Sequence, residues 1–171
     1  FFGEYISESE DNLKYISSFT GSAGFAVILK NKNYMFVDGR YTVQAGIQCG
    51  DQFKIYTIPQ KYPFNVFKKE NLNLGFDPKL HTEKSLNRLF GNPFINLRPI
   101  NENLIDLTWK REKNSNIKPF YIMEDKDAGL KVNRKLTKLL KLIKANKVNY
   151  LFTTASENVA WLLNTRGQDT D

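Results

Sequence analysis

The sequence predicts an α/β protein in which a mixed β-sheet is flanked by helices. Two apolar runs, 25–29 and 34–37, lie on either side of the polar residues 31–33, a pattern typical of an antiparallel hairpin. Further along the chain, strand-like runs alternate with short segments of helical apolar spacing, as expected of a mixed sheet with helices on its faces. With 41% hydrophobic and 13% aromatic residues, the chain has enough apolar side chains for a packed core.

Local patterns predict the other elements of the first part of the chain. In order, these are a helix over 8–17, the two hairpin strands, a helix over 41–49, a strand over 53–58, a helix over 63–70, a strand over 72–76, a helix over 82–90, a strand over 94–100 and a helix over 103–110. The first helix follows from the capping-box spacing of Ser7 and Glu10. The second helix should carry Val43 and Ile47 on one face and end at Gly50.

A polar segment, 111–118, has the composition of a linker. Beyond it we expect a helix over 131–144, a strand over 148–154, and a helix that is capped by Ser156 and ends near Asn164. This pattern of strands and helices has no continuation, and an unfinished sheet cannot bury both of its faces. The second domain is therefore expected to be incomplete.

The formal net charge of +7 is concentrated on the helix predicted over 131–144. The cations on one side of this helix are Lys131, Arg134, Lys135, Lys138, Lys141 and Lys144. The opposite, apolar stripe consists of Val132, Leu136, Leu139, Leu140 and Ile143. No aromatic residues lie between the cations to stack on bases, so we interpret the basic side as a solvated helix face and expect no nucleic-acid partner.

The sequence also gives expectations about the cellular compartment. No apolar run approaches the length of a bilayer span and no signal-peptide pattern is present, so we expect no membrane association. The single cysteine, Cys49, excludes an internal disulfide and is compatible with a reducing cytoplasm. Because Cys49 lies in a predicted helix, we expect it to be a small buried hydrophobic residue rather than a nucleophile.

A charged cluster follows the second hairpin strand, with the sequence Asp38-Gly39-Arg40-Tyr41. Gly39 permits a sharp turn, and Arg40 carries a permanent planar charge that suits carboxylates and carbonyls. Arg40 is therefore our candidate substrate-binding residue. The alternative is an internal ion pair of Arg40 with Asp38 or another carboxylate, which would only stabilise the turn.

Three motifs resemble those of one peptidase family. They are FTGSAG with VDGRY and the pair Gln44-Ala45, then Glu102-Asn103-Leu104-Ile105-Asp106 with Trp109, and finally SENVAWLLNTRG over 156–167. In this order they resemble the three-domain Xaa-Pro aminopeptidases, called aminopeptidase P. The resemblance covers nearly the whole chain.

The resemblance implies a domain arrangement for this chain. It places a creatinase/prolidase-like amino-terminal domain at 1–112, a linker at 113–130 and the beginning of a second, similar domain at 131–171, with the catalytic pita-bread domain absent. In such relatives the third domain binds two divalent metal ions, usually manganese, through two Asp, one His and two Glu. The metals activate a water that cleaves the bond before a proline in second position.

The resemblance also implies properties of the full-length protein. It implies a cytoplasmic homodimer that acts on peptides with proline in second position, and it places Arg40 where an amino-terminal-domain arginine reaches the peptide. The only histidine, His81, lies in a turn, and Asp125 with Asp127 lies in a polar loop, so we expect none of the three to bind metal. This fragment should therefore support substrate binding and assembly, hold no metal or catalytic residue, and be inactive alone.

Two alternatives remain open. One is a non-catalytic peptidase-like module that binds proteins, as some chromatin proteins of the histone-chaperone type do. The other is a prolidase- or creatinase-type hydrolase, which the second-domain motif disfavours because those relatives have two domains. The sequence that follows Asp171 would separate the leading hypothesis from the non-catalytic one, because the five metal ligands are either present there or absent.

Limited proteolysis tests the predicted organisation. The first cut should fall between Arg111 and Lys131, because the polar segment there offers few side chains to a core. Mass spectrometry of the first fragments identifies the cleaved bond. Equal resistance throughout the chain would contradict the prediction and would mean that the second block is covered by a partner surface.

Overall fold

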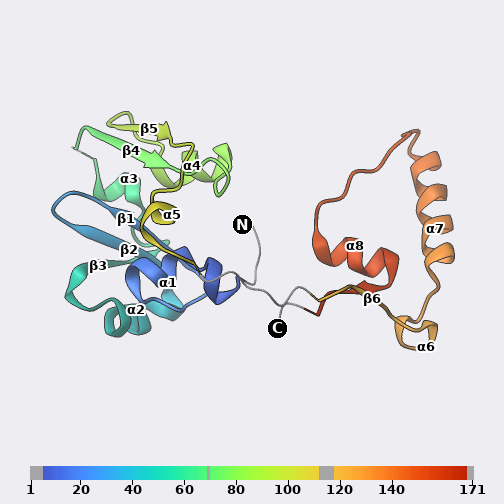
Figure 1. Ribbon diagram of the computed structural model, residues 1–171. Coiled ribbons are helices and arrows are strands. Elements are labelled where there is room, and N and C mark those ends of the chain that lie inside the picture. Colours follow the sequence, from blue (N-terminus) through green and yellow to red (C-terminus); the bar gives the residue numbers. More distant parts are fainter. Residues whose placement is uncertain (1–5, 69, 112–117, 169–171) are drawn as a thin grey trace. The chain divides into compact units, whose positions relative to one another are not determined.

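The computed structural model describes residues 6–68, 70–111 and 118–168 (Figure 1). The chain divides into two compact units, Phe1–Lys113 and Asn114–Asp171, which we call unit 1 and unit 2. Most of the polar segment 111–118, namely residues 112–117, lies outside the described residues.

A three-stranded mixed sheet forms the centre of unit 1 (Figure 1). Strands β1 (Gly24–Ile28) and β2 (Asn33–Asp38) are antiparallel, as the hairpin pattern predicts. The chain then passes through a short 3-10 turn, η2 (Gly39–Tyr41), and helix α2 (Thr42–Cys49) to strand β3 (Phe53–Ile58), which runs parallel to β2. Strand β2 therefore lies between the other two strands.

A second, two-stranded sheet completes unit 1. Its strands, β4 (Leu72–Phe76) and β5 (Ile95–Pro99), are parallel and are connected by helix α4 (Glu83–Phe90). Helix α4 begins and ends within a residue of its predicted limits. The predicted mixed α/β fold is thus confirmed, with the strands divided between two sheets.

Two helices of unit 1 are shorter than predicted. Helix α3 (Pro63–Val66) is a single turn instead of the predicted 63–70, and α5 (Leu104–Thr108) is shorter than 103–110. Helix α3 ends early because the next residue, Phe67, leaves the helical conformation and is completely buried.

The predicted amino-terminal helix over 8–17 is divided in two. A 3-10 turn, η1 (Glu8–Glu10), precedes the α-helix α1 (Asn12–Ser17). Ser7 occupies the N-cap position of η1, but its side chain makes no capping hydrogen bond, so the predicted capping box is wrong. The α-helix is instead capped by Asp11, whose side chain accepts a hydrogen bond from the N–H of Lys14 at 2.9 Å. Because aspartate is a preferred N-cap residue, Asp11 favours a helix that begins at Asn12 over one that begins at residue 8.

The exposed face of α2 is the one that the sequence pattern marked as apolar. Val43 and Ile47 are 76% and 77% exposed, whereas Ala45 and Cys49 are buried against the sheet. Small residues allow α2 to lie close to β2 and β3, and larger side chains at these positions would hold the helix away. The expectation that Cys49 is buried is confirmed, and burial raises the pKa of its thiol.

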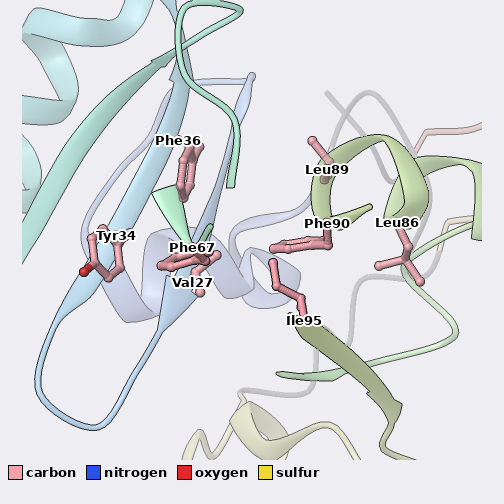
Figure 2. Close-up of a cluster of buried hydrophobic side chains, with 8 residues drawn as sticks. All are labelled: Val27, Tyr34, Phe36, Phe67, Leu86, Leu89, Phe90 and Ile95. Atoms are coloured by element: carbon pink, nitrogen blue, oxygen red, sulfur yellow. The ribbon is translucent and has the colours of Figure 1, made fainter. Parts of the chain in front are cut away.

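The core of unit 1 has two parts, one on each face of β2. Figure 2 shows the first part, in which Tyr34 and Phe36 pack with Phe67 of the α3 segment and with Phe90 of α4. In the second part, Met35 and Val37 pack with Phe19, Ala45, Cys49 and Phe53. Burial of each large apolar side chain contributes roughly 1.5–3 kcal/mol to folding, so β2 contributes strongly to the stability of both parts.

Within residues 118–168, unit 2 contains three helices and one small ladder. The helices are α6 (Asp125–Ala128), α7 (Val132–Ala145) and α8 (Ser156–Leu163), and the antiparallel ladder joins β6 (Tyr121–Ile122) to β7 (Thr165–Arg166). The longest of them, α7, has 14 residues. In the ranges that the structure describes, no helix is both long and apolar enough to cross a membrane.

The strand predicted over 148–154 is wrong. This segment forms no strand, and its aromatic residues Tyr150 and Phe152 are 90% and 89% exposed. A strand requires a neighbouring strand to pair its backbone groups, and within the described residues none pairs with this segment. The predicted cap of α8 is also wrong, because Ala155 occupies the N-cap position and the Ser156 hydroxyl donates to Glu157.

Lys135 does not belong to the solvated basic face of α7, because it is only 3% exposed. Its ammonium donates to the backbone oxygen of Trp161 at 2.6 Å and to Oδ1 of Asn164 at 2.5 Å. It also lies 4.1 Å from the centroid of the Trp161 ring. The last carbonyl groups of a helix lack helical partners and attract cations, so Lys135 of α7 binds the carboxyl end of α8.

Replacement of Lys135 by Met should destabilise unit 2. The Met side chain keeps the apolar contacts but removes two charge-assisted hydrogen bonds, each worth about 1.5–3 kcal/mol. Amide exchange of Met123, whose N–H donates to the backbone oxygen of Asn164 at 2.7 Å, should become roughly ten- to a hundredfold faster. Lys138→Met, at an exposed position of the same helix, is the control. Equal exchange rates in the two variants would show that the buried ammonium has no stabilising role.

Candidate functional site

Asp38 and Arg40 form a closed turn at the end of β2. Oδ1 of Asp38 accepts hydrogen bonds from the backbone N–H of Arg40, at 3.0 Å, and from its side-chain Nε, at 2.8 Å. An aspartate that binds the backbone two residues ahead makes such a turn by itself. The ion pair that the sequence left as the alternative role for Arg40 is therefore present.

Gly39 is not required for the sharpness of this turn. Its φ is outside the left-handed region, and a Cβ added there would lie at an ordinary 3.6 Å from Cγ2 of Thr57. The structure thus corrects the expectation that glycine permits the turn: the carboxylate of Asp38 shapes it.

The Asp38–Arg40 pair leaves part of the guanidinium available to a ligand. The side chain of Arg40 is 73% exposed, and within the described ranges neither of its Nη groups has a hydrogen-bond partner. An ion pair this exposed contributes little to stability because water screens it. The two Nη groups match the spacing of a carboxylate and can also donate to a single carbonyl oxygen.

The charges of the pair change the acidity of both partners. The hydrogen bond from the Arg40 side chain, together with that from its backbone N–H, holds the pKa of the Asp38 carboxyl below its usual value. The same contact raises the pKa of Arg40. Asp38 is therefore ionised near neutral pH and keeps Nε of Arg40 in a fixed position.

Tyr41 and Ser22 are neighbours of this site that belong to the sequence motifs but to which the sequence patterns assigned no role. The ring centroid of Tyr41 lies 5.5 Å from Cζ of Arg40, and its hydroxyl is 2.8 Å from that of Ser22. Thr20, in the same loop as Ser22, is hydrogen-bonded to Gln44 and Gln48 of α2. The i, i+4 spacing of the two glutamines is the one sequence signal that could have indicated this loop–helix contact.

The residues considered as metal ligands do not come together. His81 belongs to unit 1, where its ring lies against Phe76 and burial lowers its pKa. Asp125 and Asp127 belong to unit 2 and lie in helix α6 rather than in the expected loop, and Asp125 pairs with Lys131 at 3.1 Å. Across residues 6–68, 70–111 and 118–168, no group of three or more His, Cys, Asp or Glu residues could hold a metal ion. The described residues therefore do not fit a two-metal centre.

Comparison with known families finds two matches along the chain. Models described as the creatinase/prolidase N-terminal domain match residues 4–104 and, in a second form, residues 111–171. Together they cover both units.

Comparison with individual proteins finds relatives over almost the whole chain. "Aminopeptidase P1" of Lotus japonicus is 31% identical over 97% of this chain, and "Probable Xaa-Pro aminopeptidase P" of Coprinopsis cinerea is 30% identical over 99%. A crystal structure of an X-prolyl aminopeptidase from Caenorhabditis elegans, described as a cytosolic enzyme with a di-nuclear active site, matches 98% of this chain with a TM-score of 0.82 and 28% identity. The chain spans 26%, 29% and 29% of the lengths of these three proteins.

Removal of the Arg40 charge should raise the pKa of Asp38. In Arg40→Gln the carboxyl loses the guanidinium, so its titration midpoint should move up toward the ordinary value for aspartate. Because the folded-state pKa is lowered, the stabilisation from this pair is present above the unfolded-state pKa and is lost as the pH falls through the folded-state pKa. The NMR chemical shift of the Asp38 carboxyl carbon against pH measures the midpoint. Identical midpoints in the two proteins would contradict the contact.

Proposed function

Because the chain belongs to the creatinase/prolidase amino-terminal domain family, we propose that it is the amino-terminal part of a metal-dependent Xaa-Pro aminopeptidase. Such an enzyme removes the first residue from peptides that have proline in second position. The observation that carries the proposal is the likeness to aminopeptidase P relatives over 97% of the chain and not over one motif only. This part contributes substrate binding and assembly, and the chemistry belongs to residues that the relatives carry in their remaining length.

Arg40 is the residue that we assign to the peptide substrate. Its Nε is held by Asp38, and this contact fixes the direction of the guanidinium. Its Nη groups remain available, on a side chain that is mostly exposed at the end of a rigid strand. A charged donor in this position would hold a carbonyl or carboxylate of the bound peptide, which orients the peptide without taking part in bond cleavage.

The cofactor and assembly follow from the same proposal. The di-nuclear active site of the C. elegans enzyme supports two divalent metal ions, and we propose manganese. The described residues do not supply their ligands, so these would come from a further part of the protein. We also propose a cytosolic homodimer, in keeping with the description of the C. elegans enzyme as cytosolic.

Kinetics of Arg40 variants in the longer protein test the role of this residue. A charged hydrogen bond is worth about 1.5–3 kcal/mol, so Arg40→Ala should lower kcat/KM for an Xaa-Pro peptide by roughly ten- to a hundredfold. Arg40→Lys should recover little, because an ammonium cannot make a two-pronged contact. Comparison of a peptide with a free carboxyl end and its amide tells whether a carboxylate or a carbonyl is bound.

The control and the melting temperature separate binding from folding. Arg88→Ala removes a positive charge at an exposed position of α4 and should leave kcat/KM unchanged. If Arg40→Ala lowers Tm while kcat/KM per folded molecule keeps the wild-type value, Arg40 is a structural residue. Absence of turnover in the longer wild-type protein with added manganese would favour the non-catalytic binding module instead.

A further inference from the structure

We infer that Tyr41 and Ser22 are positioning residues that hold Arg40 ready for the peptide. This inference rests on the proposed function, in which Arg40 binds the substrate. In this role neither residue takes part in the chemistry. Both act only by holding the guanidinium of Arg40 in place.

The aromatic ring of Tyr41 lies against the guanidinium of Arg40. Cζ of Arg40 lies 5.5 Å from the ring centroid, within the distance at which a cation is attracted to an aromatic face. Nε is at the same time held by Asp38 at 2.8 Å. An exposed arginine otherwise populates many rotamers, and a ligand would have to restrict them on binding. The contacts with Asp38 and Tyr41 already restrict these rotamers in the free protein, so less restriction remains to be imposed when the peptide binds.

The position of the Tyr41 ring is itself determined by the loop that precedes β1. The hydroxyl groups of Tyr41 and Ser22 are 2.8 Å apart, and the ring of Phe19 meets that of Tyr41 edge to face, with centroids 5.9 Å apart. At Gly21 an added Cβ would lie 2.8 Å from Cδ1 of Tyr41 and closer still to the ring of Phe19. Only glycine therefore lets the loop lie this close to the tyrosine.

The same loop is attached to α2 at a second point. The Thr20 hydroxyl accepts hydrogen bonds from Nε2 of Gln44 at 3.0 Å and of Gln48 at 2.9 Å, and the Thr20 N–H donates to Oε1 of Gln48 at 3.0 Å. The hydrogen bonds of Thr20 to α2 thus hold the loop that carries Ser22, and so keep the Ser22 hydroxyl beside that of Tyr41. These groups lie near the surface, where a hydroxyl pair adds little to global stability, which favours a local role in orienting Arg40.

A double-mutant cycle in the longer protein tests the inference. Tyr41→Phe keeps the ring and removes the hydroxyl, and it should lower kcat/KM by roughly two- to tenfold, mainly through KM. Ser22→Ala should have the same effect, and the double variant should be no worse than either single variant, because both remove one contact. In an Arg40→Ala background, Tyr41→Phe should change kcat/KM less than twofold. Tyr15→Phe, a hydroxyl removed elsewhere on unit 1, is the control and should have wild-type kinetics.

The outcomes separate this inference from the proposed function. If Arg40→Ala has wild-type kcat/KM, the proposed role of Arg40 fails and the inference fails with it. If Arg40→Ala is impaired while Tyr41→Phe has wild-type kinetics, only the positioning role is overturned. It is also overturned if Tyr41→Phe lowers kcat/KM by the same factor with and without Arg40, since Tyr41 then acts independently. The Nε–H NMR signal of Arg40, which should shift in Tyr41→Phe and Ser22→Ala but not in Tyr15→Phe, reports the guanidinium position without turnover.

Discussion

Burial of both faces of strand β2 is the constraint on which the rest of unit 1 depends. Four successive residues, 34–37, are buried, and alternate side chains enter different parts of the core. This is possible because β1 and β3 pair with the two edges of β2, so that its backbone polar groups have partners without water. Helices cover the faces, as the continuous apolar run of a fully buried strand requires.

The candidate site takes its position from the end of this strand. The core fixes Val37, and the next residue, Asp38, is the first whose side chain reaches solvent. Asp38 turns the chain into η2 and so directs Arg40 outward. A flexible cationic side chain is thereby attached to the end of a strand with four buried residues in succession, and firm support of this kind suits a residue that must meet a ligand in one orientation.

Unit 2 is held together by a different kind of interaction. Within residues 118–168 the buried residues are both polar, Lys135 and Asn164, and large apolar side chains such as Tyr150 and Phe152 are exposed. Asn164 also donates to the backbone oxygen of Leu130 at 3.0 Å, so that it connects the start of α7 with the end of α8. Directional hydrogen bonds hold these helices together, because residues 118–168 include no buried apolar side chain.

Local chemistry in the sequence determined the elements whose signals are local. The hairpin follows from two apolar runs on either side of a polar turn, and α4 follows from its apolar spacing and its flanking residues. The position of Arg40 after a strand could also be predicted, because Asp-Gly-Arg-Tyr directly follows an apolar run.

Only the tertiary structure decided features that depend on distant residues. Helix α2 buries Ala45 and exposes Val43 because it must lie close to the sheet, and Lys135 is buried because α8 ends beside it. The contact between Tyr41 and Ser22, which are 19 residues apart in the sequence, also depends on the tertiary structure, because no local pattern encodes which loop packs on which turn. The segment 148–154 has the composition of a strand but forms none, because strand structure belongs to a pair of segments and not to one.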